Sequence, residues 1–455
     1  MIRLDVFFDR RLAGSLSENP ETNLFAFSYA PAWLEEPLRY ALSPHLPLVP
    51  AEGQTAATHS ARVRRFFENL LPEGRALDEA AAANKVSKSN LIGLMIALGR
   101  ETTGALALRL ASADDTIGET GNEPAQGKEM PPRLLPATEL SQRIKERPYV
   151  PFSVWDGKVR LSIAGYQDKV AVFKDGKDWY LIDSGRLAST VILKPEPSNG
   201  MLNGLTSNEF FCMRLAAKAG LPTARVRLVH VPEPVLEVER FDRIPDGDTV
   251  RRLHVIDGCQ ALDISSMLKY ERPYGDRPDV RAIRDGASLP QLFALLAHST
   301  SPAAQRLQLL RWTIFQILIG NTDAHAKNLS FFYDHEGMRL TPAYDLVSIT
   351  AFGDGNIENT YAMAIGDAFT EAELTPYEWA HFAHLCGLRQ QLVARELRKM
   401  SAEVLRVMSD LRKETNQEGA DAGMLDQICG IIMPIAQRQM RISGEIAGVD
   451  PRLFS

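Results

Sequence analysis

The stretch Gly320-Asn-Thr-Asp-Ala-His-Ala-Lys-Asn places an amide, Asn328, five residues after a carboxylate, Asp323. Phosphoryl transfer uses one carboxylate to orient the attacking hydroxyl and a nearby amide oxygen to hold Mg²⁺. Protein kinases supply both groups from one loop, with the spacing Asp-x-x-x-x-Asn. Lys327, between the two, could neutralise charge on the transferred group. An Asn- and Asp-rich turn that closes the preceding apolar helix explains the pair alone equally well.

A second carboxylate, Asp345, follows seventeen residues after Asn328, in Leu340-Thr-Pro-Ala-Tyr-Asp at the end of a predicted strand. A site with two Mg²⁺ ions needs such a carboxylate shortly after the catalytic loop. Alone, Asp345 would be an ordinary acid in a turn after a proline. Its order and spacing after Asn328 favour a metal-binding role.

Lys194 and Glu209 are candidates for a phosphate-binding pair upstream of the loop. Val191-Ile-Leu-Lys ends a β-type run at Lys194, and a strand-end lysine can contact the α- and β-phosphates of ATP. Glu209, fifteen residues later, opens a helix predicted over 209–219 and could pair with Lys194. An acidic residue favoured by the helix dipole explains Glu209 at least as well, and strand-end lysines are common on surfaces.

The segment 236–243, Leu-Glu-Val-Glu-Arg-Phe-Asp-Arg, is typical of a strand that runs into a hinge. Backbone groups of Glu239, Arg240 and Phe241 could face an adenine there. The alternative is a charged, exposed strand end.

The segment 161–170, Leu-Ser-Ile-Ala-Gly-Tyr-Gln-Asp-Lys-Val, stands where a phosphate loop would be. The chain contains neither GxGxxG nor a Walker motif, and this segment has a single glycine. Its small residues Ser162, Ala164 and Gly165 still let backbone amides approach phosphate. Alone, the segment predicts only a hairpin turn.

Composition and charge exclude several classes of protein. The 455 residues are 45% apolar and 24% charged, which is typical of a globular protein long enough for two or three domains. A net charge of −6 argues against binding nucleic acid through global charge. No apolar run approaches the roughly 18 residues of a membrane span, and the charged N-terminus is unlike a signal peptide. Four widely spaced cysteines without CxxC predict a reduced, cytoplasmic protein.

The elements that must position these residues divide the chain into four parts. Residues 1–111 predict a compact N-terminal unit with a strand, a turn and a strand, then helices over 61–71 and 89–98, the second capped by Ser89. Residues 112–136 lack large apolar side chains and predict a linker or long loop. Residues 137–243 consist of short β-type runs around one helix, and residues 244–455 are nearly all helical, with helices over 289–297, 303–319, 372–386 and 390–413. The order predicts an α+β fold: a two-lobed kinase-like core, a small mixed-sheet lobe and a helical lobe, after an additional small N-terminal domain.

Two further patterns have simpler explanations. His381 and His384 have the i, i+3 spacing of one helix face, but no His or carboxylate motif completes a metal set, so packed or exposed roles are expected. Residues 387–413 carry seven basic and three acidic side chains, a modest excess that could contact DNA and that more often marks a solvated face.

Taken in order, the motifs resemble those of HipA-type toxins, the serine/threonine kinases of bacterial type II toxin–antitoxin pairs. The matching motifs are Ser162-Ile-Ala-Gly-x-Gln-x-Lys, the strand that ends at Lys194, Val238-Glu-Arg-Phe-Asp-Arg, Gly320-Asn-Thr-Asp-Ala-His-Ala-Lys-Asn and Pro342-x-Tyr-Asp. The resemblance covers nearly the whole chain. Residues 66–75, Phe-Phe-Glu-Asn-Leu-Leu-Pro-Glu-Gly-Arg, are similar to part of the small domain that precedes the kinase core in this family.

The resemblance implies a role for each matched residue. Asp323 would be the catalytic aspartate, and Asn328 and Asp345 would hold Mg²⁺. Ser162 matches a serine that family members autophosphorylate, which moves the loop out and switches the kinase off. Tyr166 and Asp168 stand where Ala and Glu are common, and neither change removes a charge or a backbone donor. The residues implied to bind ATP are Ala164, Gly165, Tyr166, Gln167, Asp168, Lys169, Lys194, Glu239, Arg240, Phe241, His325, Lys327, Asn328, Tyr344 and Asp345.

Characterised members phosphorylate an aminoacyl-tRNA synthetase and bind a small helix-turn-helix antitoxin that also binds operator DNA. The resemblance therefore implies ATP and Mg²⁺ as cofactors, the antitoxin and a synthetase as partners, operator DNA only through the antitoxin complex, and no membrane. Two alternatives stay open. A small-molecule phosphotransferase on a kinase-like fold shares Asp-x-x-x-x-Asn. A catalytically idle DNA-regulatory subunit is disfavoured by the complete catalytic set and by the net charge.

Overall fold

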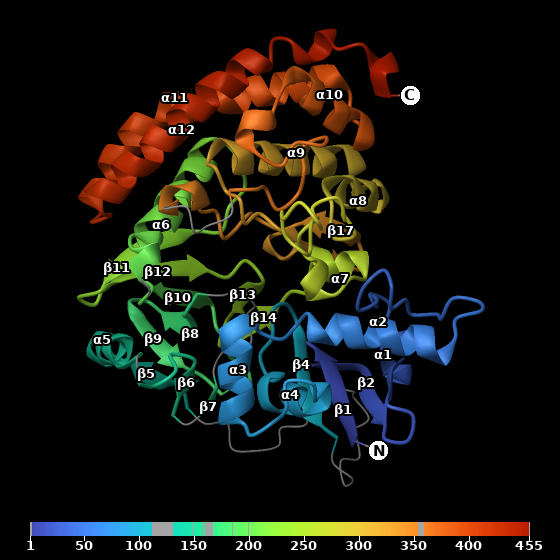
Figure 1. The fold of residues 1–455 in the computed structure, drawn as a ribbon. Helices are drawn as coiled ribbons and strands as arrows, with labels where there is room; N and C mark the ends of the chain where they lie inside the picture. Colours follow the sequence, from blue (N-terminus) through green and yellow to red (C-terminus); the bar gives the residue numbers. More distant parts are fainter. Residues whose placement is uncertain are drawn as a thin grey trace. The chain divides into compact units, whose positions relative to one another are not determined.

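The computed structural model describes residues 2–111, 131–147, 149–156, 158–159, 167–183, 185–198, 200–353 and 359–454. The chain forms two compact units, and Figure 1 labels many of their helices and strands. The first unit comprises residues 1–198, 230–256 and 332–337, and the second comprises 199–229, 257–331 and 338–455.

The first unit begins with an antiparallel four-stranded sheet in the order β3-β2-β1-β4. Its strands are β1 (Ile2–Phe8), β2 (Arg11–Asn19), β3 (Leu24–Tyr29) and β4 (Leu106–Leu110), and its helices are α1 (Pro31–Glu35), α2 (Ala56–Glu68), α3 (Gly74–Ala83) and α4 (Leu91–Leu98). The predicted strand, turn and strand are confirmed by the register Leu4↔Leu16 between β1 and β2. The predicted cap of α4 is wrong. Asn90, not Ser89, caps it, because the Asn90 side-chain oxygen accepts the Gly93 N–H at 2.8 Å.

The first unit holds five strands of a second sheet, paired in the order β12-β10-β8-β9-β5. They are β5 (Arg133–Leu135), β8 (Val170–Asp175), β9 (Asp178–Leu181), β10 (Val191–Pro195) and β12 (Pro234–Glu239). β5 comes from the end of the segment predicted as a linker, whose residues 112–130 lie outside the described ranges. Helix α5 (Ala137–Glu146) follows β5, and two hairpins pair β6 (Val154–Trp155) with β7 (Lys158–Val159) and β13 (Arg243–Asp246) with β14 (Thr249–Arg252).

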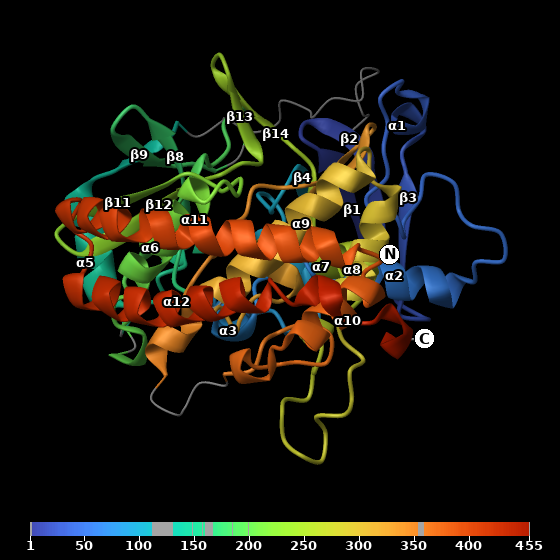
Figure 2. The ribbon, with the colours of Figure 1, turned by 90° about the horizontal axis from the view of Figure 1, so that it is seen from above.

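The second unit is mainly helical, and the predicted extent of a helical lobe over residues 244–455 stays a prediction. Its helices are α6 (Leu205–Lys218), α7 (Gly258–Leu262), α8 (Leu289–Leu295), α9 (Pro302–Leu318), α10 (Pro376–Leu385), α11 (Gln390–Gln417) and α12 (Ala422–Ile442). Figures 1 and 2 show α11 and α12 running side by side. α9 is buried at every residue from Trp312 to Leu318, which makes it a central element of this unit. The strands β11 (Val226–His230), β15 (Val255–Asp257), β16 (Ser330–Asp334) and β17 (Gly337–Leu340) lie where the chain passes from one unit to the other.

Two predictions about helices need correction. α6 begins at Leu205, after Gly204 with φ +84°, so Glu209 does not open the helix but lies buried inside it. A pairing of Glu209 with Lys194 stays a prediction, because the two residues belong to different units. Helix α12 was not predicted, because Pro434 and two glycines interrupt its sequence pattern. Among the described residues, no helix has the length and apolar character needed to cross a membrane.

Candidate active site

The loop that carries Asp323 begins where helix α9 ends. Gly320 has φ +63°, and a Cβ there would lie 2.3 Å from Thr350 Oγ1, so only glycine fits. The Asn321 N–H donates to the Gln316 carbonyl at 2.9 Å, which closes the helix in the manner of a Schellman motif. The chain thereby leaves α9 just before Asp323.

The backbone of Asp323 is held by two asparagines. Its N–H donates to Asn321 Oδ1 at 3.0 Å, and its carbonyl accepts Asn328 Nδ2 at 2.8 Å. Asn321 Nδ2 in turn donates to Gln316 Oε1 of α9 at 2.8 Å. The Asp323 side chain is 48% exposed, and its Oδ1 accepts the Tyr270 hydroxyl at 2.5 Å. A carboxylate on a fixed backbone is thus accessible to a substrate.

Asn328 and Asp345 are suitable oxygen donors for Mg²⁺. The Asn328 amide nitrogen contacts the Asp323 carbonyl, which identifies the amide oxygen as the atom that could bind a cation. Asp345 has φ +58°, a left-handed conformation that an L-residue adopts at a cost and that recurs at functional sites. An amide oxygen and a carboxylate are ligands that this hard cation accepts, so the residue types fit the ion.

Lys327 and His325 offer a bound phosphate less positive charge than predicted. Lys327 Nζ lies 2.6 Å from Asp257 Oδ2, and the lysine side chain is 3% exposed, so a protein carboxylate already balances its charge. Burial, followed by the charge of Lys269, lowers the pKa of His325 to about 3. His325 is therefore neutral at physiological pH and can offer a hydrogen bond to a phosphate but no positive charge.

The Tyr344 hydroxyl forms its hydrogen bonds with other groups of the protein. The group donates to the Lys327 carbonyl at 2.9 Å and shares a hydrogen bond of 2.6 Å with Ser330 Oγ. Burial raises the pKa of Tyr344 far above its ordinary value, so the hydroxyl stays protonated. This contact ties the residue before Asp345 to the catalytic loop.

The first unit carries the other residues expected to bind nucleotide. Lys194 is buried in β10, opposite Leu236 of β12, and Lys169 is buried just before β8. Gln167 Nε2 donates to the Pro195 carbonyl at 3.3 Å, beside Lys194 in sequence. The structure thus brings part of the predicted phosphate loop next to the end of β10.

Asp168 is engaged with a buried arginine. Its Oδ2 lies 3.4 Å from Arg147 Nη1, and the same guanidinium donates to the Glu196 carbonyl at 2.7 Å. Ser162 and the loop residues Ala164, Gly165 and Tyr166 lie outside the described ranges.

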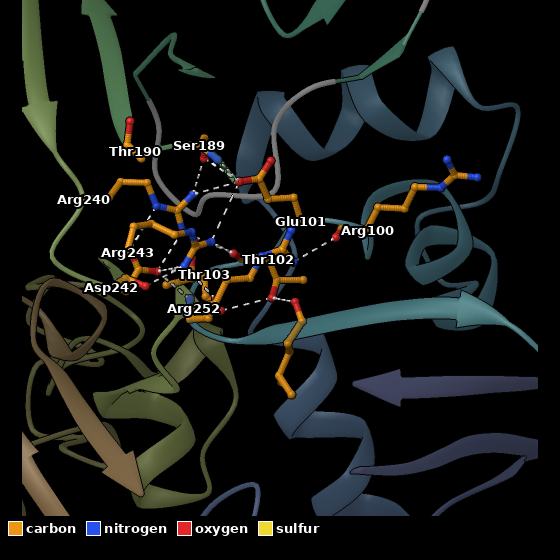
Figure 3. Close-up of polar contacts among 12 residues, drawn as sticks. Arg100, Glu101, Thr102, Thr103, Ser189, Thr190, Arg240, Asp242, Arg243 and Arg252 are labelled. Atoms are coloured by element: carbon orange, nitrogen blue, oxygen red, sulfur yellow. Dashed lines mark hydrogen bonds and ion pairs between the residues drawn. The ribbon is translucent and has the colours of Figure 1, made fainter. Parts of the chain in front are cut away.

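The predicted hinge lies at the end of β12, where Glu239 is exposed and Arg240 is buried. The Arg240 N–H donates to the Thr190 carbonyl at 2.9 Å, so this backbone donor belongs to the sheet and not to an adenine. Figure 3 shows the Arg240 side chain turned into a polar cluster, where it binds Asp242 at 3.0 and 2.8 Å and donates to Ser189 Oγ at 2.8 Å. An adenine-binding role stays a prediction for Glu239, Arg240 and Phe241, with the Arg240 N–H already engaged in the sheet.

The cluster joins three segments of the first unit that are far apart in sequence (Figure 3). Asp242 Oδ2 also accepts Arg243 Nη1 and the Gly104 N–H, each at 2.8 Å. Glu101 Oε1 accepts the Ser189 N–H at 2.7 Å and lies 3.8 Å from Arg240 Nη1. Burial opposes ionisation of Asp242, but the charges of Arg240 and Arg243 outweigh it and hold its pKa well below its usual range. Sequence analysis missed this cluster, although two arginines and an aspartate beside a buried strand are a signal for it.

The neighbourhood of His381 also differs from the expected one. Carboxylates of Asp367 and Glu378 lie near the ring, with Asp367 Oδ2 3.5 Å from His381 Nδ1. Arg284 Nη1 donates to Asp367 at 2.6 Å, so a guanidinium already occupies one side of the group. A cation would have to compete with this ion pair.

Comparison with known proteins places this chain in a family. Models of the HipA N-terminal domain and the HipA-like C-terminal domain match residues 4–109 and 161–408. The serine/threonine-protein kinase toxin HipA of Shewanella oneidensis is 37% identical over 413 residues, which are 90% of this chain and 89% of that protein. The chain belongs to the HipA family of serine/threonine-protein kinases. The predicted family and enzyme class are confirmed.

One further relative and one solved structure extend the match. A putative kinase of Sinorhizobium fredii, Y4mE, is 33% identical and covers 93% of this chain and 95% of its own length. The solved structure of S. oneidensis HipA with HipB and operator DNA matches with a TM-score of 0.82 at 34% identity, over 98% of this chain and 100% of that one. The α+β fold with its additional N-terminal domain is thus the HipA fold, as predicted.

Proposed function

We propose that this HipA-type kinase is the toxin of a toxin–antitoxin pair, that it uses ATP and Mg²⁺, and that Asp323 is its catalytic carboxylate. The observation that carries the proposal is the setting of Asp323, whose side chain is half exposed while Asn321 and Asn328 hold its backbone. A group that orients a substrate hydroxyl needs both access and a fixed position.

The nucleotide site follows from the same assignment. Asn328 and Asp345 would hold Mg²⁺, and bound Mg²⁺·ATP would supply the phosphoryl group with its charge partly neutralised. Lys194 and Lys169 are the proposed cationic contacts of the phosphates in the first unit. His325 would donate a neutral hydrogen bond, because its charge is suppressed by burial.

Replacing Asp323 by Asn tests the catalytic assignment. Asn keeps the side-chain volume, and the backbone contacts of residue 323 do not involve its carboxylate, so the fold should be retained. Phosphoryl transfer from labelled ATP should fall by about 10² to 10⁴. Asp410→Asn, at an exposed position, is the matched control and should keep full activity. Wild-type transfer by Asp323→Asn would show that the assignment is wrong.

The acceptor distinguishes a protein kinase from a small-molecule phosphotransferase. We expect labelled phosphate in protein bands of a bacterial lysate, with an aminoacyl-tRNA synthetase as the proposed target. Label found only in small metabolites would favour the phosphotransferase.

Autophosphorylation at Ser162 is the proposed means of self-inactivation. If this loop binds the ATP phosphates as proposed, a dianionic phosphate on it would repel them. Mass spectrometry after incubation with Mg²⁺·ATP should find phosphate at Ser162, and the phosphorylated form should be inactive. Phosphate only at other serines would exclude this site.

A small helix-turn-helix antitoxin is the proposed partner, with operator DNA bound only through the complex. The HipA relative of known structure was solved with HipB and operator DNA. The net charge of −6 gives little affinity for DNA alone. Basic side chains of α11 that form ion pairs with acidic residues are Arg395, Arg406, Arg412 and Lys413. Operator affinity across a salt series, with and without antitoxin, should show binding only when antitoxin is present.

A further inference from the structure

Tyr270 lies in the long segment between α7 and α8, far from Asp323 in sequence. Its hydroxyl donates to Asp323 Oδ1 at 2.5 Å. We propose that Tyr270 is a positioning residue for phosphoryl transfer, which fixes the rotation of the Asp323 carboxylate so that it meets the substrate hydroxyl in one orientation. This inference rests on the proposed catalytic role of Asp323.

The carboxylate needs such a partner because its own side chain is half exposed. The terminal torsion of an aspartate has a broad energy profile, so an unheld carboxylate rotates among many orientations. A hydrogen bond from a hydroxyl to a carboxylate is among the short, strong ones and restricts this rotation. Small errors in the position of a reacting group reduce the rate steeply, so this restriction acts on the rate of transfer.

Tyr270 is itself held against the catalytic loop. Its ring packs edge-on against His325, with 5.0 Å between centroids and an interplanar angle of 89°. The Lys269 ammonium lies 5.5 Å from the ring centroid, and the Lys269 carbonyl accepts the Ala326 N–H at 3.1 Å. The tyrosine and the residue before it thus contact the loop at Asp323, His325 and Ala326.

The residue after Tyr270 is anchored on the other side. Glu271 is 3% exposed, its N–H donates to the Ala362 carbonyl at 2.8 Å, and its carboxylate accepts Arg284 Nε at 2.6 Å and the Ala364 N–H at 2.8 Å. A Cβ on Gly286 would lie 1.8 Å from the Tyr270 carbonyl oxygen. Gly286, at the far end of the segment, therefore packs directly against the backbone of Tyr270. The contacts of Glu271 and Gly286 therefore fix the segment from which Tyr270 contacts Asp323.

Tyr270→Phe tests the inference because it removes only the hydroxyl and keeps the ring contacts with His325 and Lys269. The measured quantities are the maximal rate of autophosphorylation with labelled ATP and the ATP concentration at half-maximal rate, on protein first treated with phosphatase. We expect the maximal rate to fall about tenfold to a hundredfold, with half-saturation and the thermal midpoint unchanged. Tyr274→Phe is the matched control, since Tyr274 lies on the same segment and is 58% exposed. It should behave as wild type.

A double variant separates positioning from a general structural role. Where Asp323 is already Asn, Tyr270→Phe should cause no further loss of rate, because the two changes act through one group. An unchanged or increased rate in the single Tyr270→Phe variant would overturn the inference, and so would a loss of ATP affinity as large as the loss of rate. If Asp323→Asn itself kept the wild-type rate, the proposed function would fail. If Asp323→Asn were inactive and Tyr270→Phe fully active, only the inference would fail.

Discussion

Lys327 and Asp257 form an ion pair in which Nζ lies 2.6 Å from Oδ2. The same aspartate is the N-cap of α7, and its side chain accepts the Gln260 N–H at 2.8 Å in a capping box. The Gly258 N–H donates to the Leu329 carbonyl at 2.9 Å. One carboxylate therefore both caps a helix and balances the lysine of the catalytic loop.

Asp257→Ala should be strongly destabilising, because it removes the carboxylate that balances the buried Lys327 and also removes a helix cap. We expect the free energy of unfolding in urea to fall by about 3–5 kcal/mol. Asp279→Ala breaks an exposed pair with Arg277 and is the control, with an expected change of about 1 kcal/mol or less. Equal losses in the two variants would contradict a structural role for the Asp257–Lys327 pair.

Asp345→Asn should weaken binding of Mg²⁺·ATP without unfolding the chain. The change removes the charge that would bind the metal, while Asn tolerates the left-handed conformation at φ +58° nearly as well as Asp. Isothermal calorimetry should show at least about a tenfold loss of Mg²⁺·ATP affinity, with unchanged unfolding in the absence of nucleotide. Asp345→Ala should add a small loss of stability, since Ala fits this conformation poorly. Wild-type affinity in both variants would exclude Asp345 as a metal ligand.

Asp242→Ala should destabilise the first unit, because the buried Arg240 and Arg243 would lose their nearer carboxylate partner and keep only Glu101, at 3.8 and 3.9 Å. Removing one partner of a buried ion pair costs about 3–5 kcal/mol. Asp246→Ala, at an exposed position three residues from Arg243, should change the free energy of unfolding by about 0.5 kcal/mol or less. Chemical denaturation followed by circular dichroism measures both. A loss under about 1 kcal/mol in Asp242→Ala would show that the arginines find other partners.

His254 should make stability depend on pH. Burial lowers its pKa to about 4, and its Nε2–H donates to the Leu42 carbonyl at 2.8 Å. The unfolded chain takes up a proton below about pH 6.5, whereas the folded chain keeps the ring neutral. The buried, neutral His254 therefore makes its full contribution to the free energy of unfolding above about pH 6.5. This contribution falls by about 3 kcal/mol in total as the pH falls towards 4.

Urea unfolding between pH 4 and 7 tests this contribution in two variants. His254→Gln should flatten the pH dependence, because the amide can still donate to Leu42 but does not titrate. His298→Gln, at an exposed histidine, should leave the dependence unchanged. The same slope in wild type and His254→Gln would show that another group controls it.

Local motifs were the part of the candidate site that could be predicted from sequence. Asp323 and Asn328 belong to one short loop, so their spacing was visible directly, and the apolar pattern of α9 predicted the helix before it. The contacts of Tyr270 and Asp257 with that loop could not be predicted, because each joins residues more than fifty positions apart. The side-chain contacts of Arg240 could not be predicted for the same reason, and its hinge role stays a prediction. Its motif was read from neighbours in sequence, whereas its partners Ser189 and Glu101 come from other segments.

The polar cluster around Arg240 also limits which deletions and recombinations of this gene preserve the protein. Glu101 and Gly104 come from the N-terminal domain, and their partners Ser189 and Asp242 come from the kinase core. A deletion or recombination that separated the two coding regions would leave two arginines in the core with part of their acceptors missing. Residues 101–104 and 240–243 should consequently be inherited as one block, and a foreign N-terminal domain should be accepted only if it brings a carboxylate to the position of Glu101.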